Sequence, residues 1–172
     1  MTIHIEHRLD RFLEEEIEDI KKLGDALLWE EGKITGDKVD HTIRDTRIGW
    51  LHPTTETHWL FDRAIIIFAS TLRFNMLQSM QYTIYDSKGS HYDWHRDIGG
   101  DEIAKARVTV GIVQLSHPSE YKGGVLQIKH EDEIIDVMKP KGMVTTFPIQ
   151  LLHRVTPVTS GVRKTLIMWG LK

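Results

Sequence analysis

The stretch YDSKGSHYDWHRD, residues 85 to 97, contains aromatic and polar residues between Gly and Ser punctuation, a composition typical of short strands joined by turns. It holds two His-x-Asp pairs, and a third pair, His130 with Asp132, lies in KHEDE further along the chain. Residues i and i+2 of a strand point to the same side, so such a pair can offer two ligands to one metal ion. The spacing alone is weak evidence, because a chain with 10 histidines should contain about one such pair by chance.

The ligand types narrow the kind of metal site. The chain has no cysteine, which excludes disulfides, thiolate metal sites and thiol nucleophiles. Two His and one carboxylate on one face of an octahedron hold Fe(II) and leave three positions open. The third ligand has to come from a distant strand, and the candidates are His117, His130 and His153. Of these, His153 is favoured, because it opens a strand between the end of one run at Phe147-Pro148 and the last run after Gly161.

The region around this stretch is rich in predicted strands. From residue 78 onward, β-branched and aromatic runs alternate with Gly, Pro, Asp and Ser. The runs are SMQYTIY, HYDWH, ARVTVGIVQL, GVLQIK, IIDVM, GMVTTFP, HRVTPV and RKTLIMWGL. About eight strands at short spacing, without alternating helices, favour a sandwich, barrel or jelly roll over a parallel α/β fold.

The region before residue 78 is predicted to be mainly helical. An apolar stripe at steps of three and four predicts a first amphipathic helix, with Asp10 as its cap; the stripe is Leu9, Phe12, Leu13, Ile17, Ile20, Leu23, Leu27 and Leu28. Residues 30–41 are expected to form a polar loop and residues 43–51, IRDTRIGWL, a strand. The stretch His52-Pro53-Thr54 is expected to open a second helix that ends near Asn75.

The last strand carries a candidate anion site. Arg163, Thr165, Ile167 and Trp169 share one face of the predicted strand. If that face points inward, the arginine needs an anion, which a dicarboxylate cosubstrate could supply through a bidentate pair. The alternative is an exposed terminal strand with Arg163 in solvent, and periodicity alone does not separate the two.

Composition limits the partners. The chain of 172 residues has a net charge of −3, a length and charge that suit one globular domain spanning residues 1–172. We expect no nucleic-acid partner from this charge, and no membrane partner because no apolar run approaches ~20 residues. The first residues, MTIHIEHRLD, do not resemble a signal sequence, so a cytoplasmic location is expected.

Taken together, YDSKGSHYDWHRD and LLHRVTPVTSGVRKT resemble the signature of Fe(II)/2-oxoglutarate-dependent dioxygenases, in particular the prolyl hydroxylase-like group. The residues in register are Tyr85, Gly89, Tyr92, His95, Asp97, His153 and Arg163. The stretch GGVLQI is similar to the family's Gly-Gly-x-Leu turn, and IRDTRIGWL to the strand ahead of its second helix. This register selects His95 and Asp97, and assigns no ligand role to His91 or His130.

The resemblance implies a fold and a mechanism. The fold is a mainly β double-stranded β-helix, or jelly roll, buttressed by two N-terminal helices. Fe(II) would be held by His95, Asp97 and His153. The far carboxylate of 2-oxoglutarate would pair with Arg163, helped by Tyr85 and Thr165. O2 is the oxidant, succinate and CO2 are released, a C–H bond is hydroxylated, and ascorbate is a candidate reductant.

The resemblance leaves alternatives open. Lys164 is an alternative to Arg163, since some prolyl hydroxylases use Lys at the basic position. A cupin without 2-oxoglutarate fits the His and Glu spacing less well. A nucleic-acid demethylase of the AlkB type should carry a second Arg six residues after Arg163, where this chain has Trp169. A non-catalytic jelly-roll binding module is disfavoured by the full ligand set.

The substrate is expected to be a prolyl residue of a protein or peptide, with a free amino acid or other small molecule as the alternative. Six residues are candidates for lining the entrance: Arg44, Arg47, Trp94, Arg96, Arg107 and Trp169. Residues 30–41 could fold over a bound peptide. The oligomeric state is left open.

Overall fold

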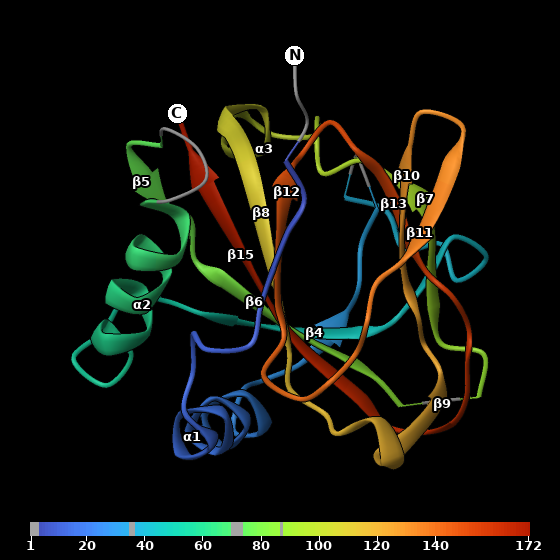
Figure 1. Cartoon of the computed structure of the whole chain (residues 1–172), viewed down its shortest axis with the longest axis horizontal. Coiled ribbons are helices and arrows are strands. Elements are labelled where there is room, and N and C mark those ends of the chain that lie inside the picture. The colour runs from blue at the N-terminus through green and yellow to red at the C-terminus, as the bar shows by residue number, and fades with distance from the viewer. Residues whose placement is uncertain (1–3, 35–36, 70–73, 87) are drawn as a thin grey trace.

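Two antiparallel sheets form the body of the structure, a computed structural model that describes residues 4–34, 37–69, 74–86 and 88–172 (Figure 1). The larger sheet contains, in spatial order, β1 (Glu6–Arg8), β12 (Val144–Pro148), β8 (Arg107–Gln114), β15 (Arg163–Leu171), β6 (Met80–Tyr85), β4 (Arg47–Leu51) and β2 (Glu30–Glu31), with β5 (Met76–Leu77) also paired to β15. The smaller sheet contains β11 (Glu133–Asp136), β10 (Leu126–His130), β13 (Leu152–Val155), β7 (His91–His95) and β3 (Arg44–Asp45). A further pair joins β14 (Val158–Gly161) to β9 (Tyr121–Gly123). The predicted jelly roll is confirmed.

The longer strands follow the sequence prediction, and two of them, β7 and β15, coincide with the runs HYDWH and RKTLIMWGL. The unpredicted elements are short: β1, β2, β5, β9, β14 after its first residue, the helix α3 (Glu102–Ala106) and the 3-10 turn η1 (Pro118–Glu120). Segments of two to five residues carry too little periodicity to be recognised from sequence.

The predicted strand over residues 43–51 is divided between the two sheets, which corrects the prediction. Arg44 and Asp45 form β3 and pair with β7, whereas Arg47 to Leu51 form β4 and pair with β6. The chain therefore passes from one sheet to the other at Thr46. This crossing sends Arg44 and Arg47 to different environments although they are three residues apart.

Both predicted helices begin later than expected. Helix α1 spans Glu14–Asp25, and its first turn is fixed by the Glu16 carboxylate, which accepts the Leu13 backbone N–H at 2.7 Å, so Asp10 is not the cap. Helix α2 spans His58–Ala69 rather than beginning at His52. The hydroxyl of Thr57 accepts the Thr54 backbone N–H at 2.8 Å in the turn before it. The predicted end of this helix falls partly on residues 70–73, outside the described residues.

The helices cover the outer face of the larger sheet (Figure 1). Apolar side chains of α1 and α2 pack there against alternate residues of β6, β8 and β15, such as Tyr82, Val113 and Met168. The opposite face of the same sheet contributes Tyr85, Ile112 and Trp169 to the interior between the sheets. Since both faces are buried, polar side chains on the inner face have to find partners inside the barrel.

No helix among the described residues is both long enough and apolar enough to cross a membrane.

Candidate metal centre and cavity

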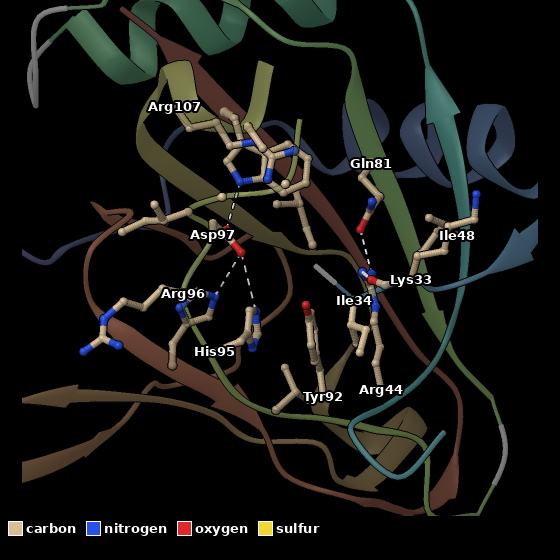
Figure 2. Close-up of a pocket in the computed structure, with 18 of the residues that line it drawn as sticks. Lys33, Ile34, Arg44, Ile48, Gln81, Tyr92, His95, Arg96, Asp97 and Arg107 are labelled. Carbon is tan, nitrogen blue, oxygen red and sulfur yellow. Dashed lines mark hydrogen bonds and ion pairs between the residues drawn. The ribbon is translucent and has the colours of Figure 1, made fainter. Parts of the chain in front are cut away.

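Three side chains from the smaller sheet and its exit loop converge on one point between the sheets. His95 ends β7, Asp97 follows two residues later, and His153 lies on β13 directly opposite His95 in the strand register. One donor atom from each of the three residues lies within 4.8 Å of the others. Asp97 Oδ1 is 3.5 Å from His95 Nε2 and 3.7 Å from His153 Nε2 (Figure 2). Two imidazoles and one carboxylate in this arrangement can hold a divalent cation such as Fe(II).

The two imidazoles are oriented by backbone carbonyls. The Nδ1 atom of His95 lies 2.7 Å from the Asp93 carbonyl oxygen, and that of His153 lies 3.0 Å from the Leu151 carbonyl oxygen. Only a protonated Nδ1 can donate to a carbonyl, so both rings carry their hydrogen there and leave the Nε2 lone pair free. Metal-binding histidines usually donate their second ring N–H to a carbonyl or carboxylate in this way.

The carboxylate is held from the side away from the histidines. The indole N–H of Trp169 donates to Asp97 Oδ2 at 2.8 Å, which leaves Oδ1 facing the two imidazoles. Burial alone would raise the pKa of Asp97, but the two neighbouring histidines and the Trp169 hydrogen bond outweigh it and hold that pKa below its usual value. Burial lowers the pKa of His153 to about 4, helped by His95. At neutral pH the carboxylate is ionised and His153 is neutral, which are the states a metal requires.

Aromatic contacts fix the rings further. The Tyr92 ring stacks on the His95 ring with centroids 3.4 Å apart, and the Phe147 ring meets His153 edge-on at 5.0 Å. Burial raises the pKa of Tyr92, so its hydroxyl keeps its proton. Neither Tyr92 nor Phe147 was assigned a role from sequence.

Arg163 lies inside the barrel and Lys164 lies outside it. Arg163 is 2% exposed and its Cζ atom is 4.9 Å from the Tyr85 ring centroid. Its Nε and Nη1 atoms have no hydrogen-bond partner among the residues that the structure describes. The Lys164 ammonium instead pairs with Asp25 of α1 at 2.7 Å. Thr165 is buried two residues along β15, between Thr83 and Gln114 of the neighbouring strands. Unpaired buried guanidinium donors are costly and indicate a site for an anion.

A cavity of about 640 Å³ opens above the three converging side chains. Among the sequence candidates, Tyr85, Arg44, Arg96, Arg107 and Trp169 line it. Arg163 lines a smaller neighbouring cavity, of about 10 Å³, that shares Ile112 and Leu126 with the large one. A cavity of several hundred Å³ is large enough for a small organic molecule and part of a second one.

Two of the six candidate substrate residues lie elsewhere, which corrects the prediction. Arg47 is paired with Asp86 and stacks over Trp29, and Trp94 is covered by Arg154 at 4.6 Å from its ring centroid. Neither lines the cavity. Arg96 lines its edge, but its Nε atom donates to the Gln150 carbonyl at 2.8 Å, and Figure 2 shows its guanidinium directed away from Asp97.

The other histidines considered from sequence lie outside the converging group. The Nδ1 and Nε2 atoms of His91 lie 2.8 and 3.1 Å from the carbonyl oxygens of Gly89 and Thr42. His117 accepts the Ser119 backbone N–H at the start of η1. His130 ends β10 opposite Glu133.

Sequence analysis missed a row of inward polar residues on β6. Gln81 and Thr83 are buried, share a face with Tyr85, and Gln81 accepts a hydrogen bond from Arg44 at 2.8 Å. Their signal was present, because alternate polar residues in the strand run SMQYTIY have the same parity as Tyr85.

Comparison with known proteins agrees with this geometry. The family model of the 2OG-Fe(II) oxygenase superfamily matches residues 80–170. A PKHD-type hydroxylase of Azoarcus sp. (strain BH72) is 29% identical, over 90% of this chain and 72% of the relative. A PKHD-type hydroxylase of Prochlorococcus marinus is 27% identical, over 84% of this chain and 67% of the relative.

Solved structures share the fold. A prolyl-4-hydroxylase of Pseudomonas putida superposes with a TM-score of 0.78 at 17% identity, over 99% of this chain and 94% of that chain. A second solved structure is a prolyl hydroxylase of Trichoplax adhaerens in complex with a peptide from the hypoxia inducible factor oxygen degradation domain. It superposes with a TM-score of 0.81 at 13% identity, over 97% of this chain and 83% of that chain.

Proposed function

The chain belongs to the 2OG-Fe(II) oxygenase superfamily, and from this membership we propose that it hydroxylates a prolyl residue of a protein or peptide, with His95, Asp97 and His153 as its iron ligands. The enzyme is a prolyl hydroxylase-like dioxygenase that uses Fe(II), 2-oxoglutarate and O2. The choice of substrate and the role of each residue are the proposal.

The observation that supports the iron site is the convergence of three donor atoms, one from each side chain. In each of these side chains the other nitrogen or oxygen is already hydrogen-bonded. Backbone carbonyls hold both Nδ1 hydrogens and Trp169 holds Asp97 Oδ2, so only His95 Nε2, His153 Nε2 and Asp97 Oδ1 face the common point. When bound, iron with its cosubstrate and O2 supplies the oxidant that replaces a substrate hydrogen by hydroxyl, with release of succinate and CO2. The protein fixes the ligands before iron arrives, which lowers the cost of ordering them.

The cosubstrate is proposed to reach from this centre to Arg163. The two unpartnered guanidinium nitrogens of Arg163 suit the far carboxylate of 2-oxoglutarate, because guanidinium and carboxylate pair in a planar fork. Tyr85 lies opposite Arg163 in the strand register and Thr165 follows Arg163 by two residues on β15, so both are proposed to border the same carboxylate. Ile112 and Leu126 line both cavities and give the passage between them apolar walls.

The substrate is proposed to occupy the outer part of the cavity. Trp50 and Trp169 line this cavity and give it an aromatic surface that suits a pyrrolidine ring. Arg107 stacks over Trp169 with its Cζ atom 4.0 Å from the ring centroid and has spare N–H groups for a substrate carbonyl. Glu30, Lys33, Ile34 and Asp37 bring the segment after α1 to the cavity wall. A related fold from Trichoplax adhaerens binds a peptide, which supports a peptide substrate here.

The test is turnover of capped proline peptides and of free proline by the iron- and 2-oxoglutarate-loaded enzyme, followed by succinate release and a mass gain of one oxygen. We expect capped peptides to be hydroxylated, His95→Ala to abolish the reaction, and His91→Ala to retain it. Hydroxylation of free proline with all capped peptides inert would contradict the peptide substrate. Equal loss in both variants would contradict the assignment of His95.

A further inference from the structure

A second buried arginine faces the cavity, and within the described part of the chain it forms no ion pair. Arg44, on β3, is 6% exposed and lines the cavity wall. Its guanidinium donates to Thr46 Oγ1 at 2.9 Å, to the Lys33 carbonyl at 2.9 Å and to Gln81 Oε1 at 2.8 Å. All three acceptors are uncharged. Three of its five N–H groups are used in this way. The Tyr92 hydroxyl, also uncharged, is a further hydrogen-bond partner of the guanidinium, so at least one N–H group is left for another acceptor.

The acidic residues that line the same cavity are engaged elsewhere. Glu30 and Asp37 lie 3.7 and 3.0 Å from the Lys33 ammonium, and Asp101 accepts the Ala104 backbone N–H at the start of α3. Asp97 belongs to the metal centre. Among the described residues, Arg44 forms no ion pair with any of these carboxylates. Arg107 differs, because the nearby carboxylates of Asp97 and Asp101 partly offset the cost of burying its charge. A buried guanidinium with only neutral partners is stabilised when an anion binds.

The cosubstrate does not supply this anion. Under the proposed function, the two carboxylates of 2-oxoglutarate are taken by the metal centre and by Arg163. Arg163 lies opposite Tyr85 on β6, whereas Arg44 is bonded to Gln81, four residues earlier on the same strand. At the usual rise per residue, Tyr85 and Gln81 are roughly 13 Å apart along β6. Arg44 therefore lies on the large cavity at some distance from Arg163, which lines the small neighbouring one.

Arg44 nevertheless lies close to the metal centre. Figure 2 shows the Tyr92 ring between His95 and Arg44. Its centroid is 3.4 Å from the His95 ring centroid and 4.5 Å from Arg44 Cζ, so Cζ lies within about 8 Å of the His95 ring. Because adjacent Cα atoms are about 3.8 Å apart, a group bound at Arg44 belongs to the oxidised residue itself or to its neighbour.

From this geometry we propose that Arg44 binds a carboxylate of the substrate, carried by the hydroxylated residue or by the residue next to it. The inference rests on the proposed function and narrows its substrate class to acidic peptides or peptides that end at the oxidised residue. Two sources give the same chemistry: an Asp or Glu side chain adjacent to the target, or a free C-terminal carboxylate.

The test measures binding apart from turnover. The enzyme is loaded with Mn(II) and 2-oxoglutarate, and calorimetry compares matched ligands that differ in one carboxylate. The capped peptides carry Asp or Asn immediately before or after proline, and a further pair is acetyl-Ala-Pro as the free acid and as the amide. We expect the acid of at least one pair to bind about tenfold or more tightly than its neutral partner, the effect of a hydrogen-bonded charge. The pair that responds identifies the source of the carboxylate.

The variants assign the effect to one residue. Arg44→Gln should remove the preference for the acid and leave the neutral ligand's affinity almost unchanged, and Arg44→Lys should keep part of the preference. Arg47→Gln is the matched control, because Arg47 lies three residues away, is paired with Asp86 and does not line the cavity. This control should keep the full preference.

Several results would overturn the inference. They are an absence of any difference within every pair, a preference that survives in Arg44→Gln, or an equal loss of acid and neutral binding that marks Arg44 as purely structural. If Arg44→Gln does not fold, the wild-type comparison and Arg44→Lys still decide. Proline hydroxylation without a preference for acidic ligands would contradict this inference and leave the proposed function intact. Binding of acidic ligands at Arg44 without proline hydroxylation would contradict only the proposed prolyl substrate.

Discussion

At the scale of single residues, Trp169 both lines the cavity and supports Asp97, a proposed metal ligand. Its indole N–H holds Asp97 Oδ2, while Arg107 covers its ring. Trp169→Phe should keep the ring and lose the hydrogen bond. We expect metal affinity to fall about 10- to 100-fold, as for other outer-shell partners of metal ligands. Anaerobic titration with Fe(II) in the presence of 2-oxoglutarate measures this affinity.

Trp50→Phe provides the control for Trp169. Trp50 also lines the cavity, but its indole N–H donates to Glu30 at 3.3 Å instead of to a proposed ligand. Metal affinity should be unchanged in this variant. An unchanged affinity in Trp169→Phe would show that Asp97 is positioned without the indole.

Arg163 and Lys164 are adjacent in sequence, but their side chains have different surroundings. Arg163→Ala removes a buried cation proposed to pair with a carboxylate, a loss of about 3–5 kcal/mol. Lys164→Ala removes a partly exposed pair with Asp25, worth about 0–1 kcal/mol. The apparent affinity for 2-oxoglutarate, measured by calorimetry on the Mn(II)-loaded enzyme, should therefore fall sharply only in the first variant. A similar loss of 2-oxoglutarate affinity in both variants would make Lys164 a candidate for binding the cosubstrate carboxylate.

At the scale of elements, α1 lies so close to the larger sheet that it requires glycine at one position. A Cβ atom at Gly24 would lie 2.3 Å from the Tyr82 ring. Alanine is the better helix former by about 1 kcal/mol, yet Gly24→Ala should lower the free energy of unfolding, because overpacking costs about 1–3 kcal/mol. Urea unfolding followed by circular dichroism measures this change. Asp19→Ala, on the exposed side of α1, is the control and should be neutral or stabilising, and an equal gain in both variants would contradict the close packing.

The elements also show which parts of the fold the sequence could predict. Strands such as β7 and β15 were predicted because alternation and punctuation fix them locally. The division of IRDTRIGWL between two sheets was not predicted, since its alternation is imperfect and the crossing at Thr46 depends on pairing with two distant strands. The positions of Arg47 and Trp94 outside the cavity follow from such pairing and not from local pattern.

At the scale of the whole molecule, the two sheets bring together residues that are distant in sequence. His95 and His153 face each other across β7 and β13, and Asp97 and Trp169 meet although 72 positions separate them. The convergence of His95, Asp97 and His153 was predictable because the distal histidine and Arg163 keep a recognisable spacing in sequence. The carbonyl and indole partners that orient it were not, because a hydrogen-bond partner leaves no mark in the spacing of the ligands.

The proposed iron site depends on His95, Asp97 and His153 acting together as ligands. The most direct measurement is anaerobic Fe(II) binding, in the presence of 2-oxoglutarate, by the wild type, His153→Ala and His130→Ala. We expect one bound iron in the wild type and in His130→Ala. In His153→Ala we expect binding at least about a hundredfold weaker, on the order expected for loss of a direct ligand. Iron retained in His153→Ala, or lost in His130→Ala, would contradict it.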